Sequence, residues 1–331
     1  MSGPSFPFLL QAFFSDELPA RRGSSPFTVA SYRDTFRLLI RFATTRTGCQ
    51  PSDLRIEDID APFLGLFLDH LETTRNNSIR TRNSRLAALH AFFSYVAIQE
   101  PSLALNCQRI LAIPTKRCVH PSVAYLTEQE AAALLAAPDT NTWIGRRDRM
   151  LLLFAIQTGL RNSEITNLKV KDVGLGVGAH VRCVGKGRKA RCTPLRHDVA
   201  AMLGEWLSHV GENPDYPVFP STHGSRMSAD ALQRLVGRHI KTAAISCPSL
   251  AKKKVTPHTL RHTAAMNLLQ GGVDLSVIAL WLGHESMLTT QIYLHEDMRL
   301  KEQALAHTNE AGLVPCRYVA EDPLLTFLES L

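Results

Sequence analysis

Apolar residues recur at helical spacing in two long stretches of the first third of the chain. In SPFTVASYRDTFRLLIRFATTR the apolar face is formed by Val29, Tyr32, Phe36, Leu39 and Ile40. In NNSIRTRNSRLAALHAFFSYVA the apolar face is formed by Leu86, Leu89, Phe93 and Val96. Each pattern predicts an amphipathic helix with one face in a core. We therefore expect a helical domain over residues 1–113.

The next segment separates this domain from a second one. Residues 114–125 contain two prolines and are predicted to form an extended linker. Thr127 and Glu130 then give the capping-box pattern that marks the start of a helix. We expect a second domain over residues 126–307, followed by a C-terminal tail over residues 308–331.

The second domain is predicted to be mostly helical with a small sheet. The runs AHVRCV and ARCTPL have the composition of β-strands and are joined by GKGRK, which predicts a tight hairpin. Helical patterns are predicted over residues 197–209, 228–244, 258–270, 274–282 and 286–294. The fold class expected for the whole chain is mainly α with a small antiparallel β-sheet.

Composition narrows the classes of partner. Of the 331 residues, 45% are apolar, which is typical of a globular chain with a buried core. Lys and Arg number 37 against 30 Asp and Glu, for a net charge of +7. This excess favours a polyanionic partner, nucleic acid first. A basic protein without such a partner is the alternative.

Cysteine usage and apolar runs bear on the compartment. The seven cysteines are odd in number and include no CxxC pair, so neither a disulfide framework nor a thiolate zinc site is indicated. Reduced thiols are typical of cytosolic proteins. The N-terminus lacks the pattern of a signal peptide, and the longest apolar run is too short to span a membrane. We expect a cytoplasmic protein with no membrane partner.

Candidate chemistry begins in the stretch VTPHTLRHTAAMNLLQ. Thr256 and Pro257 predict a helix start. His258 and Arg261 then share one face of its first turn, where free N–H groups and a partial positive charge favour an anion. A buried, hydrogen-bonded histidine beside a surface arginine is the alternative. His258 and His262 also have the spacing of two zinc ligands, but the acidic residue of HExxH is missing, so no metal site is expected.

Three other segments carry candidate residues. In TGLRNSE, Arg161 precedes Glu164 by three positions, which an ordinary ion pair within a helix would also explain. In GKGRK, Lys186 lies at the hairpin tip, where a solvent-exposed lysine is the alternative. In LGHESMLTTQIYLH, His284 precedes Tyr293 by nine positions, after an apolar helix.

Together these motifs resemble the catalytic domain of the tyrosine recombinases, the phage integrase and Xer-like family. The resemblance rests on TGLRNSEITNLKVKD, GKGRKARCTPL and HTLRHTAAMNLLQGGVDLSVIALWLGHESMLTTQIYLH, and covers residues 126–307. Residues 1–113 are similar, by pattern more than by motif, to the family's helical core-binding, SAM-like domain. The resemblance implies that the two domains form a C-shaped clamp on DNA. One departure is Ile165, where leucine is usual.

The resemblance assigns a role to each candidate residue. Its implied catalytic residues are Arg161, Lys186, His258, Arg261, His284 and Tyr293. Two guanidiniums suit the oxygens of a phosphodiester, on which negative charge grows during attack. Tyr293 is the implied nucleophile, His258 the proton acceptor or relay, and Lys186 the general acid for the 5′-oxygen, while His284 orients the phosphate or the tyrosine. The implied 3′-phosphotyrosyl intermediate forms without metal, ATP or cofactor.

The resemblance also implies partners. These are double-stranded DNA with a specific recombination site, further copies of the chain in a synaptic tetramer, and an accessory recombinase or DNA-bending protein. The apolar face of the C-terminal tail fits either a neighbouring subunit or its own domain. The basic residues expected to contact DNA are Arg75, Arg80, Arg82, Arg85, Lys116, Arg117, Arg188 and Lys189.

The implied function is site-specific recombination: integration, excision or transposition of a mobile element, or resolution of replicons. Two alternatives stay open. A type IB topoisomerase would use similar chemistry on one duplex, and a DNA-binding regulator would keep the fold without the chemistry. The spacing of the motifs favours recombination over relaxation, and the complete set of candidate catalytic residues favours an enzyme over a regulator.

Overall fold

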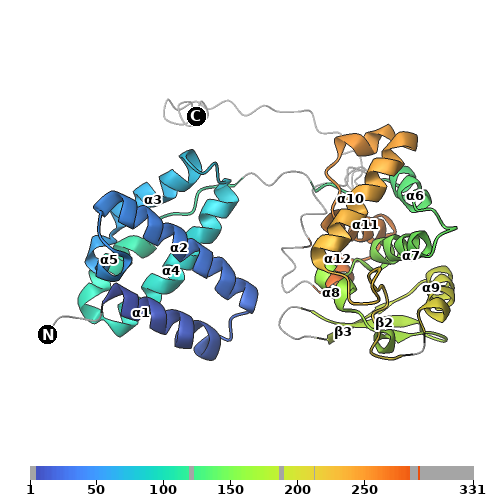
Figure 1. Ribbon diagram of the computed structural model, residues 1–331, viewed down its shortest axis with the longest axis horizontal. Helices are drawn as coiled ribbons and strands as arrows, with labels where there is room; N and C mark the ends of the chain where they lie inside the picture. Colours follow the sequence, from blue (N-terminus) through green and yellow to red (C-terminus); the bar gives the residue numbers. More distant parts are fainter. Residues whose placement is uncertain (1–4, 119–122, 186–189, 212, 284–289, 291–331) are drawn as a thin grey trace, which may run out of the picture. The chain divides into compact units, whose positions relative to one another are not determined.

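The chain forms two compact units, Met1–Pro121 and Ser122–Leu331 (Figure 1). The computed structural model describes residues 5–118, 123–185, 190–211, 213–283 and 290. These residues are mainly helical with one small antiparallel sheet, so the predicted fold class is confirmed. The predicted tail and nearly all of the last predicted helix lie outside them. Among the described helices, none is both long and apolar enough to cross a membrane.

Helices build the first unit. Its α-helices are α1 (Phe6–Ala12), α2 (Pro26–Thr47), α3 (Ala61–Thr73), α4 (Ile79–Gln99) and α5 (Ala104–Leu111), with a π-helical segment (Phe13–Arg21) after α1. The two helices predicted from periodicity are confirmed as α2 and α4, which begin after the capping residues Ser25 and Ser78. Their apolar faces meet in a core of edge-to-face phenylalanines, in which the ring centroids of Phe36 and Phe92 lie 5.1 Å apart.

The start of the predicted linker is bonded to this first unit. Glu72 of α3 accepts a hydrogen bond from Lys116 Nζ at 2.8 Å and pairs with Arg82 of α4 at 3.4 Å. Arg82 also donates to Pro114 O at 3.1 Å, and Asn83 exchanges two hydrogen bonds with the backbone of Lys116. Arg82 is therefore only 5% exposed. Arg82 was expected at DNA, and in the structure its guanidinium fixes the chain where it leaves the first unit.

The second unit is also mostly helical. Its α-helices are α6 (Glu128–Ala136), α7 (Trp143–Thr158), α8 (Asn162–Asn167), α9 (His197–Val210), α10 (Ala229–Ser246), α11 (Pro257–Gln270) and α12 (Leu275–Leu282). The predicted capping box is present at the start of α6, where Thr127 and Glu130 bond each other's backbone N–H groups. The other helices predicted within the described residues are confirmed as α9, α10, α11 and α12.

An antiparallel sheet accompanies these helices, in the order β1 (Val173–Gly174), β2 (His180–Val184), β3 (Ala190–Pro194). The predicted hairpin strands are confirmed as β2 and β3, which Figure 1 shows near α9. Side chains alternate between the two faces of the sheet. Val181 lies opposite Thr193 on the buried face, whereas Arg182 and Cys192 point to solvent. The same register places Arg191 opposite Cys183, on the buried side.

A buried ion network holds α7 in the second unit. Asp148 is fully buried, accepts hydrogen bonds from Arg147 at 2.7 and 2.9 Å, and lies 2.7 Å from Nε2 of His239 on α10. Arg147 also donates to Pro220 O at 2.9 Å, and its guanidinium lies 5.5 Å from the centre of the Trp143 ring. The buried carboxylate and guanidinium neutralise each other. Removing either one leaves the charge of the other buried and uncompensated.

We predict that Asp148→Asn lowers the free energy of unfolding by about 3 kcal/mol, because it leaves the buried Arg147 guanidinium without its counter-charge. Chemical denaturation of the full chain measures this loss. Asp198→Asn is the matched control, since Asp198 pairs with Arg196 at an exposed position, and we expect little change in stability. Equal losses in the two variants would contradict the role given to the buried network.

Candidate active site

Gly159 determines where α7 ends. It caps the helix at φ +64°, a left-handed conformation that favours glycine. A β-carbon here would lie 2.7 Å from Leu282 Cδ2 and 3.0 Å from Ala264 Cβ, so only glycine permits the close approach of α7, α11 and α12. Beyond this turn, Arg161 is the N-cap residue of α8 and has extended backbone. Arg161 thus lies at the start of a helix. The ion-pair interpretation had assumed a position inside one.

Arg161 and Glu164 do form an ion pair, but the pair has further partners. Oε2 of Glu164 accepts a hydrogen bond from the backbone N–H of Arg161 at 2.7 Å, and Oε1 accepts one from its Nη1 at 3.0 Å. Nη2 of Arg161 donates to Gly283 O at 2.8 Å. The Arg161 side chain is 31% exposed. Its guanidinium therefore keeps N–H donors on the open side, where an anion can bind.

Arg261 is the inner arginine of the site. It is only 2% exposed, although it lies in the first turn of α11. Nη1 donates to Gly159 O at 2.7 Å, and Nη2 donates to Leu282 O at 2.6 Å. The alternative from the sequence, a buried histidine beside a surface arginine, is therefore reversed: the arginine is buried, whereas His258 keeps part of its surface exposed.

Arg191 on β3 completes the cluster, although no motif in the sequence singles it out. Its Nη1 and Nη2 donate to the two carboxylate oxygens of Glu164 at 2.9 and 2.8 Å, and its Nε donates to Trp281 O at 3.1 Å. Burial alone would raise the pKa of Glu164. Hydrogen bonds from Arg191 and from the Arg161 backbone, together with both positive charges, lower that pKa instead. Glu164 is therefore an anion that two guanidiniums share.

The three arginines meet at one structural feature, the C-terminal end of α12. Arg191, Arg261 and Arg161 bond the carbonyls of residues 281, 282 and 283, in that order. The last carbonyls of a helix have no partner within the helix and carry partial negative charge, so they attract cations. The end of α12 thus orients three guanidiniums that come from α8, α11 and β3.

The two histidines of α11 lie beside this cluster. The ring centroids of His258 and His262 are 4.3 Å apart, edge to face. Protein packed around the ring, followed by the positive charges of Arg261 and Arg161, lowers the pKa of His258. Burial, His258 and Arg261 lower the pKa of His262 to about 4. Both rings are therefore neutral at pH 7. Within the part of the chain that the structure describes, no group of three or more His, Cys, Asp and Glu side chains could hold a metal ion.

The remaining predicted site residues fall into two groups. Lys186, Arg188, Lys189, His284 and Tyr293 lie outside the described residues. Of the basic residues expected at DNA, Arg75, Arg80 and Arg117 are exposed, Arg85 is half-buried, and Lys116 is exposed but paired with Glu72. The structure therefore leaves a basic surface on the first unit, without the buried Arg82.

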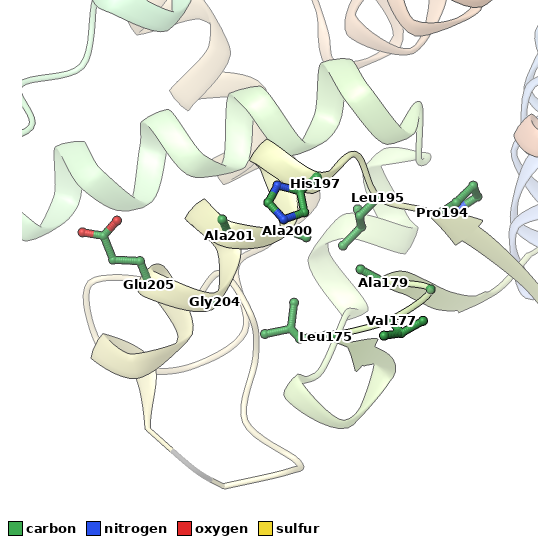
Figure 2. Close-up of a pocket in the computed structure, with 12 residues that line it drawn as sticks. Leu175, Val177, Ala179, Pro194, Leu195, His197, Ala200, Ala201, Gly204 and Glu205 are labelled. Carbon is green, nitrogen blue, oxygen red and sulfur yellow. The ribbon is translucent and has the colours of Figure 1, made fainter.

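A separate groove of about 850 Å³ lies between the β1–β2 connection and α9. Figure 2 shows Leu175 and Val177 on one side of it, and His197, Ala200 and Ala201 on α9 opposite. Its lining is mostly apolar and includes none of the clustered arginines. Residues able to bind an oxyanion are gathered at the end of α12, so we place the candidate active site there and not in the groove.

The family models match both units of the chain. Residues 124–299 match the phage integrase family, and residues 11–100 match the N-terminal SAM-like domain of phage integrases. The first of these ranges contains every described member of the arginine cluster.

Individual relatives agree with these matches. The integrase/recombinase y4rC of Sinorhizobium fredii is 50% identical over 323 residues, which cover 98% of this chain and 97% of the relative. The tyrosine recombinase XerC of Pelobacter propionicus is 33% identical, covering 87% of this chain and 91% of XerC. The structure of the XerH site-specific recombinase in a post-cleavage complex with a palindromic difH substrate has a TM-score of 0.66 and 26% identity, covering 86% of this chain and 81% of that one. The chain therefore belongs to the phage integrase family of tyrosine recombinases.

Proposed function

We propose that this protein is a site-specific DNA recombinase that cuts and rejoins strands through a 3′-phosphotyrosyl intermediate. The observation that carries the proposal is the pair of guanidiniums, Arg161 and Arg261, that neighbouring carbonyls at the end of α12 hold at 2.8 and 2.6 Å. Membership of the tyrosine recombinases supports it, because Tyr293, the nucleophile that the sequence resemblance implies, falls within the matched range 124–299.

In the proposed mechanism the two arginines hold the scissile phosphate. Attack on a phosphodiester places additional negative charge on the two non-bridging oxygens. Guanidiniums bind such oxygens through paired N–H groups, a geometry that a lysine ammonium does not offer. Because Arg161 and Arg261 are already bonded to fixed backbone carbonyls, little reorganisation is needed when the phosphate arrives.

Proton transfer is assigned to the histidine and the lysine. Tyr293 attacks phosphorus and loses its proton to His258, whose lowered pKa keeps the ring neutral and able to accept it. Lys186 donates a proton to the departing 5′-oxygen, and His284 orients the phosphate or the tyrosine. The products of this step are a 3′-phosphotyrosyl bond and a free 5′-hydroxyl. A 5′-hydroxyl from another strand reverses the reaction, so the bond energy is kept and neither ATP nor a metal is required.

Exchange between two duplexes requires four cut strands, so four protomers, each with one Tyr293, form the proposed synaptic tetramer. We propose that residues 1–113 and residues 126–307 both bind the DNA. The proposed phosphate contacts are Arg75, Arg80, Arg85, Lys116, Arg117, Arg188 and Lys189. The substrate class is double-stranded DNA with a specific site of a mobile element or replicon, alone or with an accessory recombinase or bending protein.

We predict that the wild-type protein becomes covalently attached to nicked duplexes in the presence of EDTA, and that Tyr293→Phe does not. The duplexes are drawn from DNA that flanks the gene, and a labelled band shifted on a denaturing protein gel measures the attachment. Binding of the same duplexes by both proteins is the control. Wild-type protein that binds but forms no adduct would favour the regulator. Relaxation of supercoiled plasmid by the monomer would favour the topoisomerase.

We predict that Arg161→Lys slows adduct formation by about 100-fold or more while DNA affinity stays within a few-fold. Lysine keeps the charge, but one ammonium cannot bond Glu164, Gly283 O and a phosphate in the planar arrangement of a guanidinium. Single-turnover rates and fluorescence anisotropy measure the two quantities. Arg149→Lys, an exposed position on α7, is the matched control. A rate unchanged by Arg161→Lys would remove Arg161 from the reaction.

We predict that, at DNA concentrations well below saturation, the rate of adduct formation is independent of pH between about 6.5 and about 9, where Lys186 still carries its proton, and falls at lower pH. The lowered pKa of His258 favours its neutral form, so the base is fully available above the ordinary pKa and is lost as pH falls through the lowered one. Single-turnover rates across pH measure this, together with a histidine NMR titration assigned with His258→Gln. If the rate already decreases above pH 6.5 as the pH is lowered, neutral His258 is excluded as the base.

A further inference from the structure

Arg191 lies between the backbones of Gly185 and Gly283. The first directly precedes Lys186, and the second begins the segment that contains His284 and Tyr293. A β-carbon on Gly185, which directly precedes Lys186, would lie 3.1 Å from Nη1 of Arg191. A β-carbon on Gly283, which directly precedes His284, would lie 2.8 Å from the same atom. Both backbones therefore pack against this guanidinium, and a side chain at either position would press on it.

The guanidinium of Arg191 is itself held on three sides. It forms two hydrogen bonds with Glu164 and one with Trp281 O, and its side chain is only 12% exposed. The planar fork gives both carboxylate oxygens parallel hydrogen bonds while Nε donates to a carbonyl, an arrangement that a lysine ammonium cannot reproduce. Arg191 thus joins β3, α8 and the end of α12 through one rigid group.

Arg191 also controls how strongly Glu164 attracts Arg161. The carboxylate receives two side-chain hydrogen bonds from Arg191 and one from Arg161. If an uncharged residue replaced Arg191, Arg161 would be the remaining guanidinium bonded to the Glu164 carboxylate, whose side chain is only 4% exposed. Attraction between buried opposite charges is strong, so Arg161 would be drawn toward Glu164 and away from an incoming phosphate.

We propose that Arg191 is a positioning residue for strand cleavage: it offsets the charge of Glu164, leaving Arg161 for the phosphate, and it fixes the end of α12. This inference rests on the proposed function, in which Arg161 binds the scissile phosphate. Arg191 is not assigned a contact with DNA. Its effect is expected in the rate of cleavage and not in the affinity for DNA.

The test compares Arg191→Met, Glu164→Gln and the double variant in single-turnover adduct formation on a nicked duplex. We expect Arg191→Met to slow the reaction by about 100-fold, as misplacement of a group that binds the reacting phosphate does. DNA affinity, measured by anisotropy, is expected to change by less than threefold. Adding Glu164→Gln to Arg191→Met is expected to recover about tenfold, because it removes the charge that would otherwise attract Arg161.

Two further variants keep the test decisive. Arg196→Met removes an exposed arginine that pairs with Asp198 just after β3, and it is expected to cleave like wild type. Arg191→Lys keeps the charge while losing the fork. It is expected to fold, which thermal unfolding measures, and to slow cleavage about tenfold. If Arg191→Met does not fold, Arg191→Lys provides the test in its place.

The outcomes separate the two proposals. Wild-type protein that binds DNA without forming an adduct overturns the proposed function, and the role of Arg191 with it. An active wild type with Arg191→Met and Arg191→Lys both within threefold of its rate overturns the role of Arg191 alone. So does a double variant that is slower than Arg191→Met, because a purely structural contribution predicts losses that accumulate.

Discussion

The C-terminal end of α12 is the constraint on which the candidate site depends. Buried carbonyls at a helix end need hydrogen-bond donors, and buried guanidiniums need acceptors. Here each satisfies the other, with Trp281, Leu282 and Gly283 accepting from one arginine apiece. Gly283 adopts φ +64° and closes the helix with its N–H on Ala279 and Leu280. The carbonyls and the guanidiniums therefore reach a low-energy arrangement only when they are bonded to each other.

Core packing sets the position of that helix end. The buried side chains Ile278 and Leu282 of α12 pack against Ala265, Met266 and Leu269 of α11. The indole of Trp281 donates to Thr158 O at 3.0 Å, which ties the same turn to the end of α7. A cavity or an added methyl group in this contact would shift the carbonyls, and the guanidiniums would move with them. Residues remote from the phosphate thus influence the geometry that binds it.

The individual helices of this site can be predicted from the sequence, but the contacts that bring them together cannot. Periodicity and caps predict α2, α4, α6 and α11, because a helix is a local structure with a local signature. Arg191 was missed because an arginine in a strand is usually exposed, and only pairing with the inward-facing Cys183 indicates otherwise. The burial of Arg82 was not predicted for a related reason: the run from Arg75 to Arg85 contains four arginines and no acidic residue, and burial of one of them depends on Glu72 and Pro114, which lie elsewhere in the chain. Contacts between distant segments leave no local pattern.

One electrostatic arrangement accounts for both anion binding and base chemistry. Arg161, Arg191 and Arg261 supply three positive charges against the one negative charge of Glu164, a net of +2 for these four side chains. That excess attracts a phosphate, and burial, followed by the charges of Arg261 and Arg161, lowers the pKa of His258. A phosphate bound between Arg161 and Arg261 would offset their charges and raise the pKa of His258 again. The histidine would then accept a proton more readily once substrate is in place, so binding and proton transfer are coupled through the same two arginines.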